Sequence, residues 1–213
     1  MTMFMTWFAA LATVVILLFY EVALAIAQFR FPERLARTAH ASLREEWFNA
    51  VSQQHGSEIL AIQTLRNSMM SATMTASTAV LGLMGTVTLA APSLHASFAV
   101  PSTDAPSFTA QLALELMLMA LLFASLVSSA MALRYYNHAG FICAMPIESD
   151  ARKRWTSTGI IYVRRAGVLY SWGLRQLVLV GPILASILYP AAGPIAAVIA
   201  VAVLFGFDLV DIR

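Results

Sequence analysis

The chain has 213 residues, of which 60% are hydrophobic and 11% are charged, with 13 Lys and Arg against 11 Asp and Glu. Soluble domains carry about 25% charged and roughly 45–50% apolar residues, so this composition excludes an ordinary soluble domain and a disordered chain. A net charge of +2 and a single cysteine likewise exclude a basic nucleic-acid-binding protein and a disulfide-stabilised secreted module. We therefore expect an integral membrane protein, in which each span takes roughly 20 apolar residues.

The first apolar stretch, residues 5–27, contains Glu21 as its only charge and predicts a transmembrane helix. Small residues near its end resemble the cleavage site of a secretory signal. Residues 1–7 contain no Lys or Arg, however, and a secretory signal begins with a basic region. We therefore expect this segment to be retained as the first span.

Between residues 28 and 58 the sequence becomes polar, and a set of mostly apolar side chains recurs there at helical spacing. This pattern predicts a short helix in the first loop, lying on the membrane surface with a tryptophan at the level of the lipid headgroups. The alternative is a solvated helical hairpin packed on the inner face of the protein. The residues that define this face are Leu43, Trp47, Ala50, Val51 and Gln54.

Four further apolar stretches follow, separated by one proline-rich loop, one basic block and one tight turn. Pro92 is expected to end the second span, because proline cannot donate the hydrogen bond that continues a helix. The spans are expected at residues 59–91, 108–133, 166–189 and 194–210, the extended loop at 92–107, the basic block at 134–165 and the turn at 190–194.

The distribution of basic residues predicts the orientation of these spans. Lys and Arg accumulate on the cytoplasmic side of a membrane protein. Five helices with the N-terminus outside and the C-terminus inside place all 13 basic residues on that side or in the adjacent half of a helix. We therefore expect residues 1–213 to form a single all-α membrane bundle of the cell (inner) membrane.

Several motifs, in a matching order along nearly the whole chain, resemble the multipass membrane family catalogued as domain of unknown function 599. The resemblance implies a membrane topology and no defined activity. The motifs are Ile59 to Ser68 with its Gln-Thr-Leu-Arg-Asn-Ser run, Arg134-Tyr135-Tyr136-Asn137, Met145-Pro146, Gly173-Leu174-Arg175, Pro182, Gly193-Pro194 and Phe207-Asp208.

Four ionisable residues are predicted within about two helical turns of the cytoplasmic boundary, at 1.5 Å per residue. Each costs roughly 2.5–3.5 kcal/mol to insert, so we expect the two acids and two bases to pair in a network. Such a network either fixes the register of the helices or lines a polar vestibule with Asn67 at its mouth. The four residues are Glu21, Arg66, Arg175 and Asp208.

Glu115 differs because it is predicted in the outer half of the third span, where the sequence offers no basic partner. The polar residues on that side are His95, Asp104 and Gln111. A carboxyl group in such a place either binds a proton or cation, or stays neutral and hydrogen-bonds a neighbouring helix.

The second span also has a face of small and polar residues. Small faces usually let membrane helices approach closely, and the alternative is a wall that faces water. The face consists of Asn67, Ser71, Thr75, Thr78, Gly82 and Gly85, which follow helical spacing.

The cluster Arg152, Lys153 and Arg154 predicts contact with anionic lipid at the cytoplasmic face, or else with an acidic partner protein. No metal-ligand spacing, phosphate loop or catalytic triad is evident, so we expect no metal, no cofactor and no nucleic acid.

Three classes of function are compatible with these features. The first is a homo-oligomeric channel or transporter for a small ion or solute, the second an accessory subunit of a larger membrane complex, and the third a membrane enzyme that acts on lipid. The third class would rest on Glu21, Asn137 and His138 near the inner interface. We expect the first class, without a catalytic role.

Overall fold

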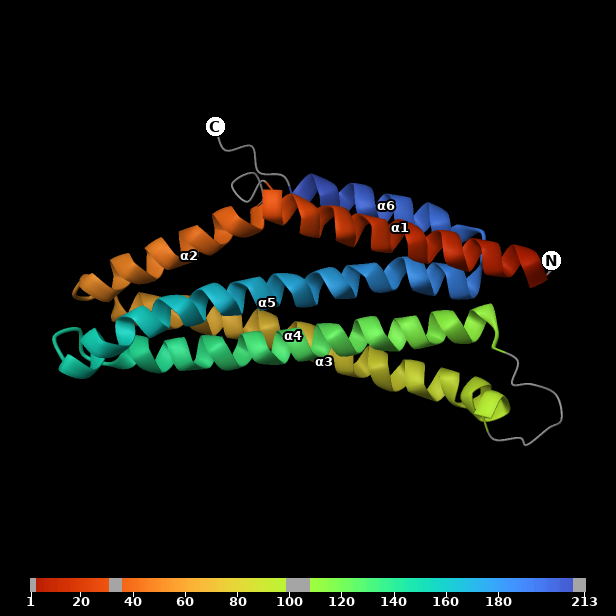
Figure 1. The fold of residues 1–213 in the computed structure, drawn as a ribbon. Helices are drawn as coiled ribbons and strands as arrows, with labels where there is room; N and C mark the ends of the chain where they lie inside the picture. Colours follow the sequence, from red (N-terminus) through yellow and green to blue (C-terminus); the bar gives the residue numbers. More distant parts are fainter. Residues whose placement is uncertain (1–2, 31–35, 99–107, 209–213) are drawn as a thin grey trace. The chain divides into compact units, whose positions relative to one another are not determined.

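The structure is a computed structural model that describes residues 3–30, 36–98 and 108–208. The described residues form six α-helices and no strand (Figure 1). The helices are α1 (Met3–Arg30), α2 (Ala36–Gln53), α3 (Glu58–Phe98), α4 (Ala110–Ala144), α5 (Asp150–Leu188) and α6 (Ala192–Asp208).

Contacts divide the chain into two compact units, and α3, α4 and α5 contribute residues to both. The apolar unit comprises Met1–Arg30, Thr78–Ala124 and Arg175–Phe207, and the polar unit comprises Phe31–Ser77, Ser125–Leu174 and Asp208–Arg213. The charged side chains of the apolar unit, within its described residues, are Glu21, Arg30, Glu115 and Arg175.

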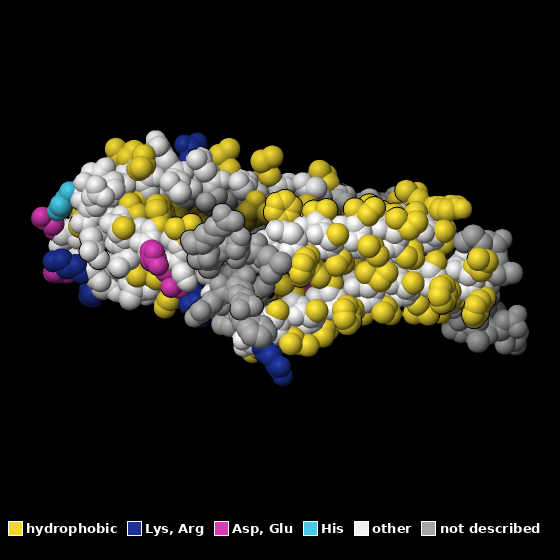
Figure 2. All heavy atoms as spheres, turned by 90° about the horizontal axis from the view of Figure 1, so that it is seen from above, with side chains coloured by type: hydrophobic (Ala, Val, Ile, Leu, Met, Phe, Trp, Pro, Cys, Tyr) yellow, Lys and Arg dark blue, Asp and Glu magenta, His cyan; other side chains and the backbone are white. Residues whose placement is uncertain are grey.

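Four helices are long and apolar enough to cross a membrane, namely α1, α3, α4 and α5, while α6 is a shorter apolar helix among the described residues. Only 22–33% of the most apolar window in each long helix is buried inside the chain. Hydrophobic side chains accordingly cover much of the surface in Figure 2. Such extensive exposed apolar surface indicates a membrane protein, because soluble monomers rarely expose large apolar patches.

The apolar unit is built around the hairpin of α5 and α6, with α1 beside α6 (Figure 1). The expected tight turn is present, and Ala192 N donates to Tyr189 O at 2.9 Å. Gly193 allows the close approach of α1, because a Cβ atom there would lie 2.5 Å from both Thr13 Oγ1 and Ser186 Cβ.

The polar unit contains α2, which packs against α5 in antiparallel register. Phe48 is fully buried and lies against Gly159, where a Cβ atom would approach the phenyl ring to 2.4 Å. Glu45 Oε1 forms an ion pair with Arg164 Nη1 at 3.0 Å, and Ser52 further along α2 pairs with Arg152 near the start of α5. The core of this unit therefore forms where α2 covers the polar ends of the longer helices.

The sequence predicts α2, but its location favours the alternative of a hairpin packed on the protein. The buried residues of α2 are Ala36, Ala41, Phe48, Val51 and Ser52. Leu43, which the helical pattern assigns to the apolar face, is 62% exposed.

One expected helix boundary was wrong. Pro92 does not end α3, which continues to Phe98. A single proline costs about 3 kcal/mol in a helix interior, and the continuous hydrogen bonds on either side of Pro92 outweigh this cost. The basic block 134–165 is also largely helical, because α4 extends to Ala144 and α5 begins at Asp150. Ser149 caps α5, and its hydroxyl accepts the Arg152 N–H at 3.2 Å.

Candidate functional site

A cavity of about 300 Å³ lies within the apolar unit, where α1, α4 and the end of α5 meet. Trp7 and Phe108 flank this region, with their ring centroids 5.9 Å apart. The cavity is lined by Thr6, Trp7, Thr109, Ala110, Gln111, Leu114, Ser186, Ile187 and Pro190.

Glu115 lies beside this cavity and is only 5% exposed. Gln111, which lines the cavity one turn earlier on α4, donates from Nε2 to Glu115 Oε1 at 2.9 Å. The second carboxyl oxygen, Oε2, is buried and has no hydrogen-bond partner among the residues that the structure describes. The polar neighbour of Glu115 therefore lies on its own helix, not on a neighbouring helix, and the second carboxyl oxygen has no described partner.

Ser186 presents a second unsatisfied polar atom at the same cavity. Its side chain is 1% exposed, and its Oγ has no hydrogen-bond partner within the described ranges of the chain. Buried polar groups are almost always hydrogen-bonded, and those that lack a protein partner usually bind water or an ion. The cavity is large enough for several water molecules, each of which occupies about 30 Å³. Its walls can therefore hydrate or coordinate a small polar ligand beside Glu115.

Arg175 is buried on α5 of the apolar unit, and its contacts lie on α1. Its Nη1 donates to the Tyr20 hydroxyl at 3.0 Å, and its Cζ lies 5.5 Å from the centre of the Tyr20 ring. Glu21 follows Tyr20 directly, is partly buried and has Oε1 in the interior. The structure thus places Glu21 and Arg175 in one unit, with Tyr20 as a polar contact that the sequence did not predict.

The other members of the predicted charge network belong to the polar unit. Arg66 and Asn67 are exposed on α3, and Asp208 is partly buried at the end of α6. A pairing of Glu21 with Arg66, or of Arg175 with Asp208, would join residues of different units and stays a prediction.

The small and polar face of α3 satisfies its hydroxyl groups within its own helix. Ser71 donates to Asn67 O at 3.1 Å, and Thr75 donates to Ser71 O at 3.0 Å. Thr75 is buried, whereas Ser71, Thr78 and Gly85 are exposed and Gly82 lies in contact distance of Leu122. Five other hydroxyl groups of α3 also donate to the backbone carbonyl four residues earlier, namely those of Thr64, Ser68, Thr73, Thr86 and Thr88. Because these hydroxyls need no water, the arrangement favours helix packing over a water-facing wall.

Arg152 departs from the predicted surface cluster, because its side chain is only 1% exposed. Its Nη1 donates to Ile142 O near the end of α4, and its Nη2 donates to Ser52 Oγ at 3.3 Å. The guanidinium group therefore joins α2, α4 and α5. The exposed part of the cluster consists of Lys153 and Arg154, which remain available for lipid or a partner.

The profile of a family described as "Protein of unknown function, DUF599" matches residues 8–211. This chain belongs to the DUF599 family. The match includes Glu115, the lining of its cavity except Thr6 and Trp7, the Arg175 contacts and the whole of the polar unit except its last two residues. Neither a curated protein nor a solved structure matches the chain. Membership in DUF599 and the apolar helices together indicate a membrane protein of unassigned activity.

Sequence reasoning alone did not select Ser186, Tyr20 or Thr13 as site residues. Ser186 and Thr13 are small polar residues within apolar stretches, and such residues are common at helix contacts in membranes. Thr13 Oγ1 donates to Ala9 O at 2.9 Å, as an isolated helix would allow, whereas Ser186 Oγ lacks a described partner. Only the three-dimensional structure separates these two cases. Within the described residues, no group of three or more His, Cys, Asp and Glu side chains could hold a metal ion.

Proposed function

We propose that this DUF599 protein is a homo-oligomeric membrane channel or transporter for a small ion or solute, with a proton or cation site at Glu115. One observation carries the proposal: a buried carboxyl group has an unsatisfied oxygen beside a cavity that also contains the unsatisfied Ser186 hydroxyl. An ionisable group at this depth in a span is expensive and is a functional candidate by default. A bound proton or cation would neutralise the carboxylate and remove much of that cost.

The proposed topology has five spans, with the N-terminus outside and the C-terminus in the cytoplasm of the inner or plasma membrane. In three helices, an arginine lies where the apolar sequence ends, namely Arg30, Arg134 and Arg165, and in α3 residues 67–98 beyond Arg66 contain no Asp, Glu, Lys or Arg. On the apolar side of its arginine, each helix extends roughly 35–50 Å at 1.5 Å per residue. That length suits a bilayer of about 40–45 Å including headgroups. The α6 helix would form the fifth, shorter span.

Glycines on exposed helix surfaces support the oligomeric part of the proposal. A Cβ atom at Gly85, Gly181 or Gly206 would meet no atom of the described chain within 4 Å. Their small size is therefore not explained by packing within the chain, and glycine in a helix costs roughly 1 kcal/mol relative to alanine. Close approach by the helix of a second copy would explain it.

Ion flux through purified protein in liposomes tests the transport proposal. A pH-sensitive dye in the lumen would report proton flux driven by a pH or potassium gradient. Glu115→Gln keeps the size and hydrogen-bonding capacity of the side chain and removes its charge. We expect the variant to lower flux by about tenfold or more, equivalent to about 1.4 kcal/mol per tenfold step.

Glu148→Gln is the matched control, because Glu148 is exposed and its ion-pair contact is with His55 at 3.5 Å. This variant should keep the wild-type flux. A wild-type pH dependence in the Glu115→Gln variant would contradict the proton role, and the absence of flux from a stable wild-type oligomer would contradict transport altogether.

A role as an accessory subunit is the second candidate, because the exposed glycines would equally admit the helix of another protein. Mild-detergent purification at the natural expression level distinguishes the two. A homo-oligomer that Gly85→Leu dissociates supports the first proposal, and a stoichiometric complex with a different membrane protein supports the second.

A further inference from the structure

A second cavity, of about 280 Å³, lies within the polar unit and is unrelated to the Glu115 site. Its polar lining consists of Arg44 from α2, Thr64 and Ser68 from α3, and Tyr136 from α4. Tyr136 is buried, and Ser68, which lines the same cavity, donates to Thr64 O at 3.1 Å. One cation and several hydroxyl groups therefore surround the cavity.

Arg44 is held in place by close packing against α5. A Cβ atom on Gly167 would lie 2.5 Å from Arg44 Cζ, so only a glycine admits the guanidinium group at this position. The one hydrogen bond recorded for Arg44 in the described chain is from Nη1 to His40 O at 3.3 Å, and it occupies one of five guanidinium N–H groups. Several donors therefore remain for a ligand.

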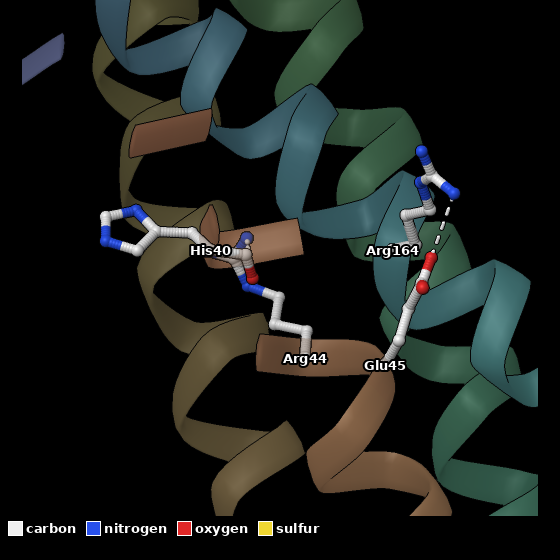
Figure 3. Close-up of polar contacts among 4 residues, drawn as sticks. All are labelled: His40, Arg44, Glu45 and Arg164. Carbon is white, nitrogen blue, oxygen red and sulfur yellow. Dashed lines mark hydrogen bonds and ion pairs between the residues drawn. The ribbon is translucent and has the colours of Figure 1, made fainter. Parts of the chain in front are cut away.

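The neighbouring acid does not neutralise Arg44. Figure 3 shows Glu45 directed toward Arg164 on α5, whereas Arg44 turns back along α2 toward His40. No carboxylate is among the described residues that line the cavity. Its charge complement is therefore an anion.

The remaining walls are apolar and are formed by Leu43, Trp47, Leu65 and Val163. An inorganic anion would gain nothing from such walls, whereas a hydrocarbon chain would gain about 0.8 kcal/mol for each buried CH₂ group. The cavity therefore combines an anion-binding group with a surface suited to an acyl chain.

The position of the cavity along the helices suits a lipid. Thr64 and Ser68 flank Arg66 on α3, and Tyr136 follows Arg134 by two residues on α4. Arg134 lies where the apolar sequence of α4 ends, and Arg66 borders the uncharged residues 67–98 of α3, as basic residues do near the headgroup level of a bilayer.

We propose that this cavity binds one anionic phospholipid, with the headgroup phosphate at Arg44 and an acyl chain along Trp47 and Leu65. The Arg44 guanidinium would donate to the phosphate oxygens, and the hydroxyls of Thr64 and Ser68 would meet the glycerol region. This assignment is independent of the Glu115 site and holds whether or not the protein transports an ion. It differs from the exposed Lys153 and Arg154, which would contact any anionic surface without enclosing a lipid.

Native mass spectrometry of the detergent-purified full chain, titrated with phosphatidylglycerol, tests the site. Wild-type protein should retain one phosphatidylglycerol molecule and exchange phosphatidylcholine freely. Arg44→Gln should weaken retention by about tenfold, because it removes the charge-assisted hydrogen bond to the phosphate. Arg164→Gln is the matched control, because it removes a cation from the same unit at the Glu45 ion pair, and it should retain the lipid.

A second variant keeps the test valid if Arg44→Gln fails to fold. Gly167→Ala preserves every charge and improves helix propensity, but its methyl group displaces the Arg44 guanidinium. It should also weaken phosphatidylglycerol retention. The proposal is overturned if both arginine variants lose the lipid equally, if phosphatidylcholine binds as well as phosphatidylglycerol, or if millimolar inorganic phosphate displaces the lipid, which would indicate a site for free anions.

Discussion

The two units of the protein bury polar groups in different ways, although three of their helices are the same. In the polar unit, the terminal nitrogens of buried Arg152 donate to Ile142 O and to Ser52 Oγ, while its Nε and the Ser129 Oγ lack a described hydrogen-bond partner. In the apolar unit, Glu115 and Ser186 each retain a buried oxygen without a described hydrogen-bond partner. The first arrangement stabilises a helical core, and the second leaves polar groups beside a cavity. Buried polar atoms without a described partner occur in both units, so the comparison teaches that a candidate binding group is one whose unsatisfied atom also lies beside a cavity.

The largest expected effect is on the core of the polar unit. Phe48→Ala should lower the free energy of unfolding by about 3–5 kcal/mol, because it leaves a cavity against Gly159. Thermal unfolding in detergent would measure the loss. Leu43→Ala is the control on the same helix and should change stability by less than about 0.5 kcal/mol, since Leu43 is exposed. An equal loss in both variants would contradict the packing of α2 on the protein.

Replacement of the buried arginine should lower stability more than replacement of its exposed neighbours. Arg152→Leu breaks the contacts with Ile142 and Ser52, and we expect a loss of about 2–4 kcal/mol in stability. Lys153→Leu should have almost no effect on unfolding, because Lys153 is exposed. If Arg152→Leu is as stable as the wild type but binds lipid more weakly, Arg152 contacts lipid and the structural role is contradicted.

Two glycines of α6 provide a test within the apolar unit. Gly193→Ala should cost about 1–3 kcal/mol, because its Cβ atom would collide with Thr13 and Ser186. Gly206→Ala has open space and should stabilise the monomer by about 0.4–1 kcal/mol. Circular dichroism during heating would compare the two. Destabilisation of the isolated monomer by Gly206→Ala would show that Gly206 is needed within the chain.

The smallest expected effect is a difference in stability between alanine variants of two buried serines. Ser125 in the polar unit donates to Gly173 O at 2.7 Å, so Ser125→Ala should cost about 1 kcal/mol. Ser186→Ala removes a hydroxyl without a described partner and should leave stability unchanged or slightly higher. Unfolding of the two variants in parallel measures the contrast. A loss of stability in Ser186→Ala would mean that its hydroxyl is bonded in the folded protein.

Composition and spacing predicted the all-helical architecture and the apolar stretches, because the length of each hydrophobic segment can be read from the sequence. The family was predicted from the resemblance of its motifs. The helix of residues 36–53 was also predictable from its periodicity, but its partner was not. Its contact with α5 depends on the register of Phe48 with Gly159 and of Arg44 with Gly167, and nothing local encodes such pairs.

The candidate site was predicted in part. Glu115 is recognisable as a lone carboxyl in an apolar stretch, and Gln111 as its partner four residues earlier. Ser186 could not be selected, because a serine in an apolar helix usually hydrogen-bonds its own backbone. The Arg152 prediction failed because a run of basic residues gives no information about which of them turns inward.

The hydrogen bonds of α3 to its own carbonyl groups have a consequence for biosynthesis. Each serine or threonine that donates one turn back carries its polar group into the membrane already satisfied. The helix can therefore enter the bilayer as an individual segment and meet its neighbours afterwards, when buried side chains such as Ala72, Ala79 and Ala90 form their contacts. Insertion of α3 before its packing against other helices would then follow from the side chains of α3 itself.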